Sequence, residues 1–158
     1  MTDGGPAPTS IDATQQRQLA VDLFNGVWQL LEKPDRSPED DDRMLHAAHA
    51  SRYHWEAVGE PVNLVRGEWQ CSRVYAMLGR AEPALHHARR SLRLCEANGI
   101  GGFDLAFAYE ALARAHAIAG DQQQASEFLR LARAAGERIA EEDDRELFLN
   151  DLASISGV

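Results

Sequence analysis

Cysteine is scarce in this 158-residue chain, which contains only Cys71 and Cys95. The two thiols do not have the spacing of metal ligands. A chain of this length can bury a core without disulfides or a structural metal. We therefore expect both cysteines to be free and buried, as in proteins of a reducing compartment.

Long apolar runs are missing as well. No stretch approaches the roughly 18 consecutive apolar residues of a membrane span. The first ten residues, MTDGGPAPTS, contain neither a basic start nor an apolar segment, so we expect no signal peptide. These absences predict a cytoplasmic protein without a membrane partner.

Positive charge is in the minority. The chain has 16 Lys and Arg residues against 25 Asp and Glu residues, and its formal net charge is −9. Such a balance repels phosphates rather than neutralising them. The sequence therefore predicts that neither nucleic acid nor an anionic membrane surface is the partner.

The composition favours helices. Hydrophobic residues make up 44 % and charged residues 26 %, as in ordinary globular proteins, while alanine is abundant and β-branched residues are sparse. We expect an all-α fold in a single domain, residues 11–158. Residues 1–10, rich in Gly, Pro, Thr and Ser, are expected to form a disordered tail.

Capping and turn signals divide the domain into seven expected helices. Ser37 followed by Pro38 and acidic residues marks one start, and Gly79 and Gly99 mark two ends. The expected helices cover residues 11–33, 38–58, 61–78, a segment from near Pro83 to Asn98, 103–119, 122–140 and a short segment after Glu141. The last carries Leu147, Phe148, Leu149, Leu152 and Ile155, which we expect to cover the open end of the fold.

An internal repeat organises these helices. A shift of 41 residues superposes Leu64 on Leu105, Arg73 on Arg114, Ala76 on Ala117, Gly79 on Gly120 and Ala84 on Ala125. A shift of 40 residues aligns residues 44–59 with residues 84–99, with seven identities in 16 positions. A period in this range predicts stacked helical hairpins rather than one closed core. We expect three antiparallel hairpins and a C-terminal capping helix.

The segment 64–132 resembles tetratricopeptide repeats in its pattern of aromatic, small and glycine residues. The matching positions are Cys71, Ser72, Tyr75, Gly79, Ala84 and Ser91 in one copy, and Tyr109, Leu112, Ala113, His116, Gly120, Ala125 and Ala132 in the next. Trp69 departs from the pattern by one position, and the closing prolines are absent. The 41-residue period is similar to long variants in sensor regions of bacterial regulators. The resemblance implies a right-handed array whose inner groove binds a peptide or another protein.

The geometry of that family places candidate partner-binding residues on the groove. They are Arg66, Trp69, Gln70 and Arg73 from the helix at 61–78, with Phe107, Glu110 and Arg114 from the helix at 103–119. Arginines beside an aromatic ring can clamp the carboxylate of an acidic peptide or of a small anionic metabolite. The alternative is structural: Arg73 or Arg114 pairs with Glu110, and Trp69 serves packing.

A second hypothesis concerns His46 and His49, which lie one helical turn apart with Tyr53 on the same face. Such a pair can share a metal or anion in a small site of an enzyme, but needs a third ligand. The sequence contains no HExxH motif, nucleophile elbow or phosphate loop. We therefore expect a protein–protein interaction module, an adaptor or regulatory subunit, rather than an enzyme, and no cofactor.

The first helix predicts a further property. Phe24, Trp28 and Leu31 form an apolar stripe on a helix that has only one neighbour in the expected stack. An exposed stripe of this kind favours self-association.

Overall fold

The computed structural model of the chain describes residues 10–155, and this part is all-helical. It contains seven helices: α1 (Ala13–Glu32), α2 (Pro38–Val58), α3 (Pro61–Met77), α4 (Ala81–Asn98), α5 (Gly102–Ile118), α6 (Gln122–Gly136) and α7 (Glu142–Ala153). Within the same residues no helix is long and apolar enough to cross a membrane. The expected tail, residues 1–10, falls outside the described residues except for Ser10.

Local signals account for most of the helix boundaries. Ser37 caps α2 by accepting a hydrogen bond from the backbone N–H of Asp40, whose carboxylate accepts one from the backbone of Ser37 in return. Gly79 and Gly99 end α3 and α4 with φ of 71° and 63°, a conformation that side chains with a Cβ rarely adopt.

Two expected boundaries were wrong by a few residues. α1 begins at Ala13 instead of near Ile11, because Asp12 and Gln15 form a capping box that starts the helix there. α6 ends at Gly136 instead of near Ala140, and Ile139 is buried in the turn that leads to α7. Neither difference changes the order of the helices.

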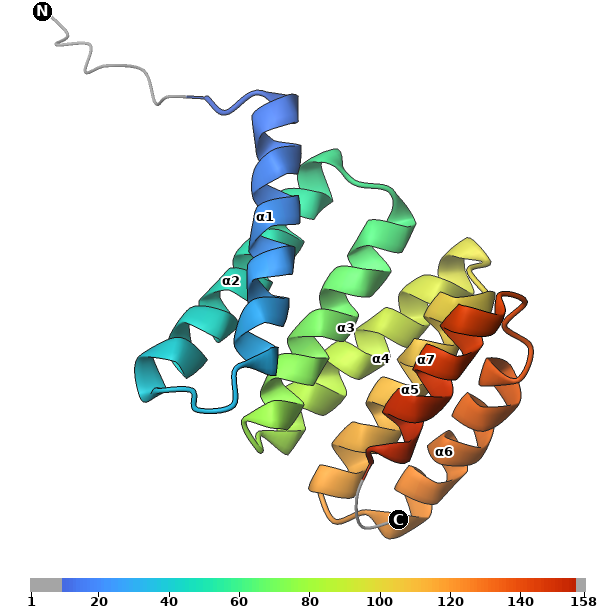
Figure 1. Cartoon of the computed structure of the whole chain (residues 1–158). Coiled ribbons are helices and arrows are strands. Elements are labelled where there is room, and N and C mark those ends of the chain that lie inside the picture. Colours follow the sequence, from blue (N-terminus) through green and yellow to red (C-terminus); the bar gives the residue numbers. More distant parts are fainter. Residues whose placement is uncertain (1–9, 156–158) are drawn as a thin grey trace, which may run out of the picture.

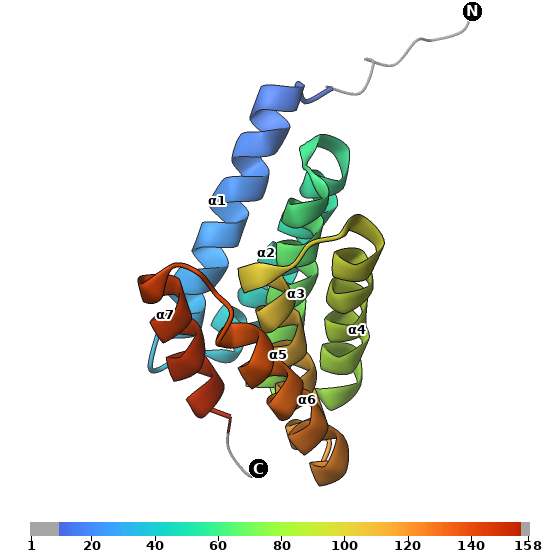
Figure 2. The same cartoon turned by 90° about the vertical axis from the view of Figure 1, so that its right-hand side faces the viewer.

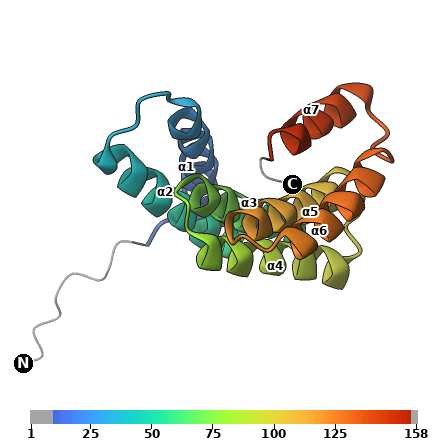
Figure 3. The same ribbon diagram turned by 90° about the horizontal axis from the view of Figure 1, so that it is seen from below.

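Consecutive helices pack in pairs, α1 with α2, α3 with α4, and α5 with α6 (Figure 1). α3 also contacts α1 and α5, so that α1, α3 and α5 follow one another along one side of the molecule. Figure 2 shows α1 and α7 on one side of α3 and α5, with α4 on the other side. Seen from below, α1 and α7 rise like two walls over a floor of α3 and α5 (Figure 3).

Small side chains make this packing close. Ala84, Ala88, Ala106, Ala125 and Ala132 are all fully buried. Their short side chains allow the helix backbones to approach one another at the crossings. The core is therefore a series of small clusters between neighbouring helices rather than one large centre of bulky residues.

The last helix lies differently from the expectation. α7 packs against α5 and α6, but it also curls over the concave side, where Asp151 reaches Arg73 of α3. Of its apolar residues, Phe148 and Leu152 are buried, while Leu147 and Leu149 remain exposed. α7 thus forms a wall of the concave side as well as covering the end of the stack.

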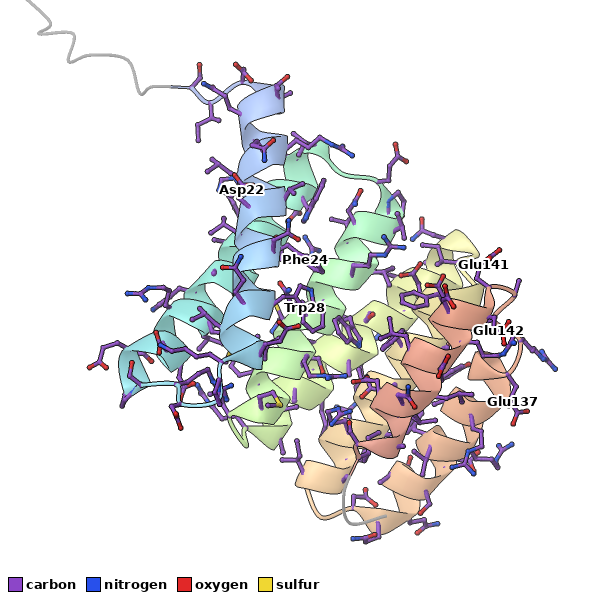
Figure 4. The ribbon with its side chains drawn as sticks, in the orientation of Figure 1. Asp22, Phe24, Trp28, Glu137, Glu141 and Glu142 are labelled. Carbon is purple, nitrogen blue, oxygen red and sulfur yellow. The ribbon has the colours of Figure 1, made fainter. Side chains whose placement is uncertain are left out.

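The apolar stripe of α1 also faces inward. Phe24 and Trp28 lie on the side of α1 that faces α3, opposite Asp22 (Figure 4), and Leu31 packs against the core beside Val27. The premise of an exposed outer stripe was wrong, because α3 continues the stack beside α1. Self-association stays a prediction without this support.

Candidate functional site

A trough runs along the concave side between α1 and α7. Its cavity volume is about 530 Å³, within the range of about 300–1,000 Å³ that ligand pockets usually occupy. Phe24 and Trp28 of α1 form one wall, and Asp144, Leu147 and Asp151 of α7 form the other. We refer to this cavity as the trough.

The floor of the trough comes from two helices. α3 and α5 contribute three residues each: Val65, Arg66, Trp69, Phe103, Asp104 and Phe107. On each helix two adjacent positions lie three and four residues before the third, so that all three share one face. The two helices that carry the internal repeat therefore build the floor together.

Aromatic rings line the trough in a continuous row. The ring centroids of Trp28 and Trp69 are 5.4 Å apart, and those of Trp69 and Phe107 are also 5.4 Å apart in an edge-to-face arrangement. Phe103 extends the row at 4.7 Å from Phe107, and the buried ring of Phe148 supports Phe107 at 4.9 Å. Such contacts hold the rings in fixed orientations, so the apolar surface of the trough is preformed.

The row follows the internal repeat. Trp28, Trp69, Glu110 and Asp151 are spaced at intervals of 41 residues and belong to α1, α3, α5 and α7 in turn. Trp28 packs on Trp69, and the indole Nε1 of Trp69 donates a hydrogen bond to Glu110 Oε2 at 3.3 Å. Equivalent positions of these four helices thus lie side by side along the trough.

Glu110 is the charged centre of the floor. Its carboxylate is fully buried and accepts from Arg114 Nε at 2.7 Å and from Arg73 Nη2 at 3.2 Å, in addition to Trp69. The same two arginines reach α7: Arg73 makes two hydrogen bonds to the Asp151 carboxylate, and Arg114 bonds the Asp151 carbonyl. Two cations and two carboxylates therefore tie α3, α5 and α7 together.

Electrostatics keep Arg73 ionised. Burial lowers the pKa of Arg73, but the neighbouring carboxylates of Glu110 and Asp151 outweigh that effect and raise it. Arg73 and Arg114 both pair with Glu110, as the structural interpretation of these arginines predicted. The carboxylate that the arginines clamp belongs to the chain itself.

The remaining candidate residues of the groove divide into two groups. Arg66, Trp69 and Phe107 line the trough, as expected. Arg66 donates two hydrogen bonds to Asp104 at 2.8 and 3.2 Å, which raise the pKa of its guanidinium. Gln70 is fully buried and donates to the backbone oxygen of Phe24 at 3.0 Å, so its expected place on the groove surface was wrong.

The histidine pair of α2 does not form a metal site. His46 is exposed, whereas His49 turns inward, where its Nε2 shares a hydrogen bond of 2.9 Å with the Tyr75 hydroxyl. Tyr53 is 71 % exposed and its ring contacts His54 instead. Across residues 10–155 no group of three or more His, Cys, Asp or Glu side chains is placed to hold a metal.

A buried polar cluster lies between α2, α3 and α4 instead. Glu68 accepts hydrogen bonds from Arg52 at 3.0 Å, from Arg90 at 3.0 Å and from His87 at 2.7 Å. Burial alone would raise the pKa of Glu68, but the bonds from His87 and Arg90 hold it at about 2. The side chain of His87 is largely buried in this cluster.

His49 joins the same cluster. Burial lowers its pKa, and the nearby ring of His87, at a centroid distance of 5.2 Å, lowers it further. The imidazole therefore stays neutral at neutral pH. Sequence analysis missed this cluster because its members come from three helices and follow no single periodicity.

No protein-family model matches the chain, and a search of curated proteins gives no match either. The functional argument therefore rests on the residues of the trough and on their geometry.

Proposed function

We propose that this chain is a tetratricopeptide-like repeat protein that binds a segment of a partner protein in its trough, as an adaptor or a regulatory subunit. The observation that carries the proposal is the preformed aromatic cavity between α1 and α7. An apolar cavity of this size, with a few charged groups at fixed positions, is typical of a binding site.

Repeat-equivalent contacts support the proposed kinship. Ser51 and Ser91 correspond under the 40-residue shift, and each donates its hydroxyl to a backbone oxygen of the preceding helix, Ala20 and Val65 respectively. α7 is in register as well, because Phe148 lies 41 residues after Phe107. We infer that α7 corresponds to the first helix of a fourth unit in a right-handed array.

The chemistry of the lining favours binding over catalysis. Its described residues are aromatic, aliphatic, aspartate and arginine side chains, without a thiol, hydroxyl or imidazole, and two of its three carboxylates are held in ion pairs. The buried Glu110 network fixes the floor, which reduces the entropy that the site loses when a partner binds. An adaptor needs an apolar binding surface and a rigid floor, and the trough has both.

A filled trough tests the proposal. Leu147→Trp places a large ring at a trough-lining position that is 58 % exposed, so the fold should tolerate it. Leu149→Trp, on the same helix but outside the lining, is the matched control. In quantitative pull-downs from lysate, we expect Leu147→Trp to lose a partner that wild type and Leu149→Trp retain. Equal capture by all three proteins overturns the proposal.

A further inference from the structure

The charged residues of the trough lining are three aspartates, Asp104, Asp144 and Asp151, and a single arginine, Arg66. Arg66 is paired with Asp104. Asp151 is paired with Arg73 of α3 and Arg114 of α5. Asp144 makes no ion pair with any residue in the described part of the chain. One carboxylate at the mouth of the trough is therefore left without a cation.

Asp144 belongs to an acidic helix end. It lies in the first turn of α7, where the positive end of the helix dipole favours a carboxylate. Glu141 and Glu142 lie at the same end of α7 (Figure 4), so acidic side chains gather beside Asp144. A chain with net charge −9 adds to the attraction for a cationic segment.

The aromatic floor suits the same kind of group. The guanidinium of Arg73 occupies one face of the Trp69 ring, at 5.1 Å from its centroid, so a ligand cation would meet the half-buried rings of Trp28, Phe103 and Phe107 instead. Trp28 and Phe107 present further rings on either side of Trp69. A cation in the trough would lie among these rings and the Asp144 carboxylate, which line the same cavity.

An acidic occupant fits less well. Each arginine near the trough already has carboxylate partners: Arg66 has Asp104, and Arg73 and Arg114 share Glu110 and Asp151. A carboxylate from outside would displace these partners and approach Asp144 as a like charge. The geometry thus favours a positively charged ligand, whereas the arginines of the sequence predicted a negatively charged one.

We infer that the trough recognises a lysine or arginine side chain that lies between apolar residues of the partner segment. The basic group takes the place between Asp144 and the aromatic floor, and the apolar neighbours pack against Phe24 and Leu147. This inference rests on the proposed function and names the chemistry of its partner.

Three capped tripeptides test it: acetyl-Leu-Lys-Leu-amide, the same peptide with norleucine as a neutral isostere of lysine, and the same peptide with glutamate. Binding is followed at low ionic strength through the indole N–H signals of Trp28 and Trp69 in proton–nitrogen NMR spectra. We expect the lysine peptide to bind about fivefold more tightly than the norleucine peptide, and the glutamate peptide to bind most weakly.

Charge variants locate the effect. Asp144→Asn should reduce the preference for lysine about threefold, whereas Asp143→Asn, in the same helical turn but outside the lining, should leave it unchanged. Asp104→Asn frees Arg66 and should raise the affinity for the glutamate peptide. Asp143 and Asp144 are exposed, so the fold is expected to persist in Asp143→Asn and Asp144→Asn.

The outcomes separate the inference from the proposed function. Equal affinity for the lysine and norleucine peptides, tighter binding of the glutamate peptide, or no signal change with any peptide overturns the inference. A preference for lysine that Asp143→Asn weakens as much as Asp144→Asn overturns it too. The proposed function is judged separately by partner capture with Leu147→Trp, which alters the volume of the trough and not its charge.

Discussion

The indole nitrogen of Trp69 donates a hydrogen bond to the carboxylate of Glu110 across 3.3 Å, although the two residues occupy equivalent positions of the internal repeat. One helix thus offers a donor and the next an acceptor at the same place in the stack. The residue type thus changes from tryptophan to glutamate at the same position of the repeat, and the glutamate is buried beneath the aromatic trough.

Removing the charge of Glu110 should destabilise the fold strongly. Glu110→Gln leaves the half-buried Arg73 and Arg114 without one of their two carboxylates, and a broken buried pair typically costs about 3–5 kcal/mol. Urea unfolding followed by circular dichroism measures the loss. Glu127→Gln is the control, because Glu127 forms an exposed pair with Arg130 and should change nothing measurable. Equal stability of both variants would contradict the central role of Glu110.

Two glycine substitutions should act in opposite directions. A Cβ on Gly136 would collide with the ring of Phe148, so Gly136→Ala should cost about 1–3 kcal/mol and loosen α7. Gly26 lies within α1 with no atom near its Cβ position, so Gly26→Ala should stabilise the protein by about 0.5–1 kcal/mol. Thermal unfolding measures both changes, and hydrogen exchange in α7 should accelerate only in Gly136→Ala. Unchanged exchange there would show that Phe148 does not hold α7 in place.

Acid should weaken the junction of α2, α3 and α4 through Glu68. Its pKa falls from 4.5 to about 2 on folding, so its contribution is complete above about pH 4.5 and is lost as the pH drops toward 2. Since one pKa unit is worth about 1.4 kcal/mol, the contribution is about 3 kcal/mol. The free energy of unfolding of wild type, measured between pH 7 and pH 3, should converge on that of Glu68→Gln. Parallel pH profiles of the two proteins would refute this assignment.

Both thiols should be inert in the folded protein. Burial raises the pKa of Cys71 to about 12 and that of Cys95 to about 11, and a thiol in this state supplies almost no thiolate at neutral pH. A thiol-reactive dye should therefore label neither residue until urea unfolds the chain, when both react. Rapid labelling of the native protein would show that one of the helix junctions opens far more easily than its packing indicates.

Much of the local structure could be predicted from the residues themselves. Ser37, Gly79 and Gly99 mark helix ends through hydrogen bonds and backbone angles that depend only on neighbouring residues. The all-α fold could be predicted from these signals together with the composition. Trp69, Phe107 and Arg66 were placed on an inner groove through the resemblance to tetratricopeptide repeats, and all three line the trough. The signals that succeeded act within one helix or between adjacent ones.

The partners of the charged residues depend on distances that no local pattern contains. Arg73 meets Asp151 only because α7, 78 residues further along the chain, curls over the concave side. Gln70 shares the helical stripe of Arg66 and Arg73, yet it is buried against α1, since the neighbouring helix covers its side of α3.

Periodicity and capping residues thus determined the helices and their order, because these depend on contacts within a few residues. Tertiary structure alone decided that the arginines of the groove pair with the chain's own carboxylates and that Asp144 has no ion-pair partner among residues 10–155. The curvature of the stack sets those distances, and it arises from the sum of many small side-chain contacts between helices rather than from any single motif.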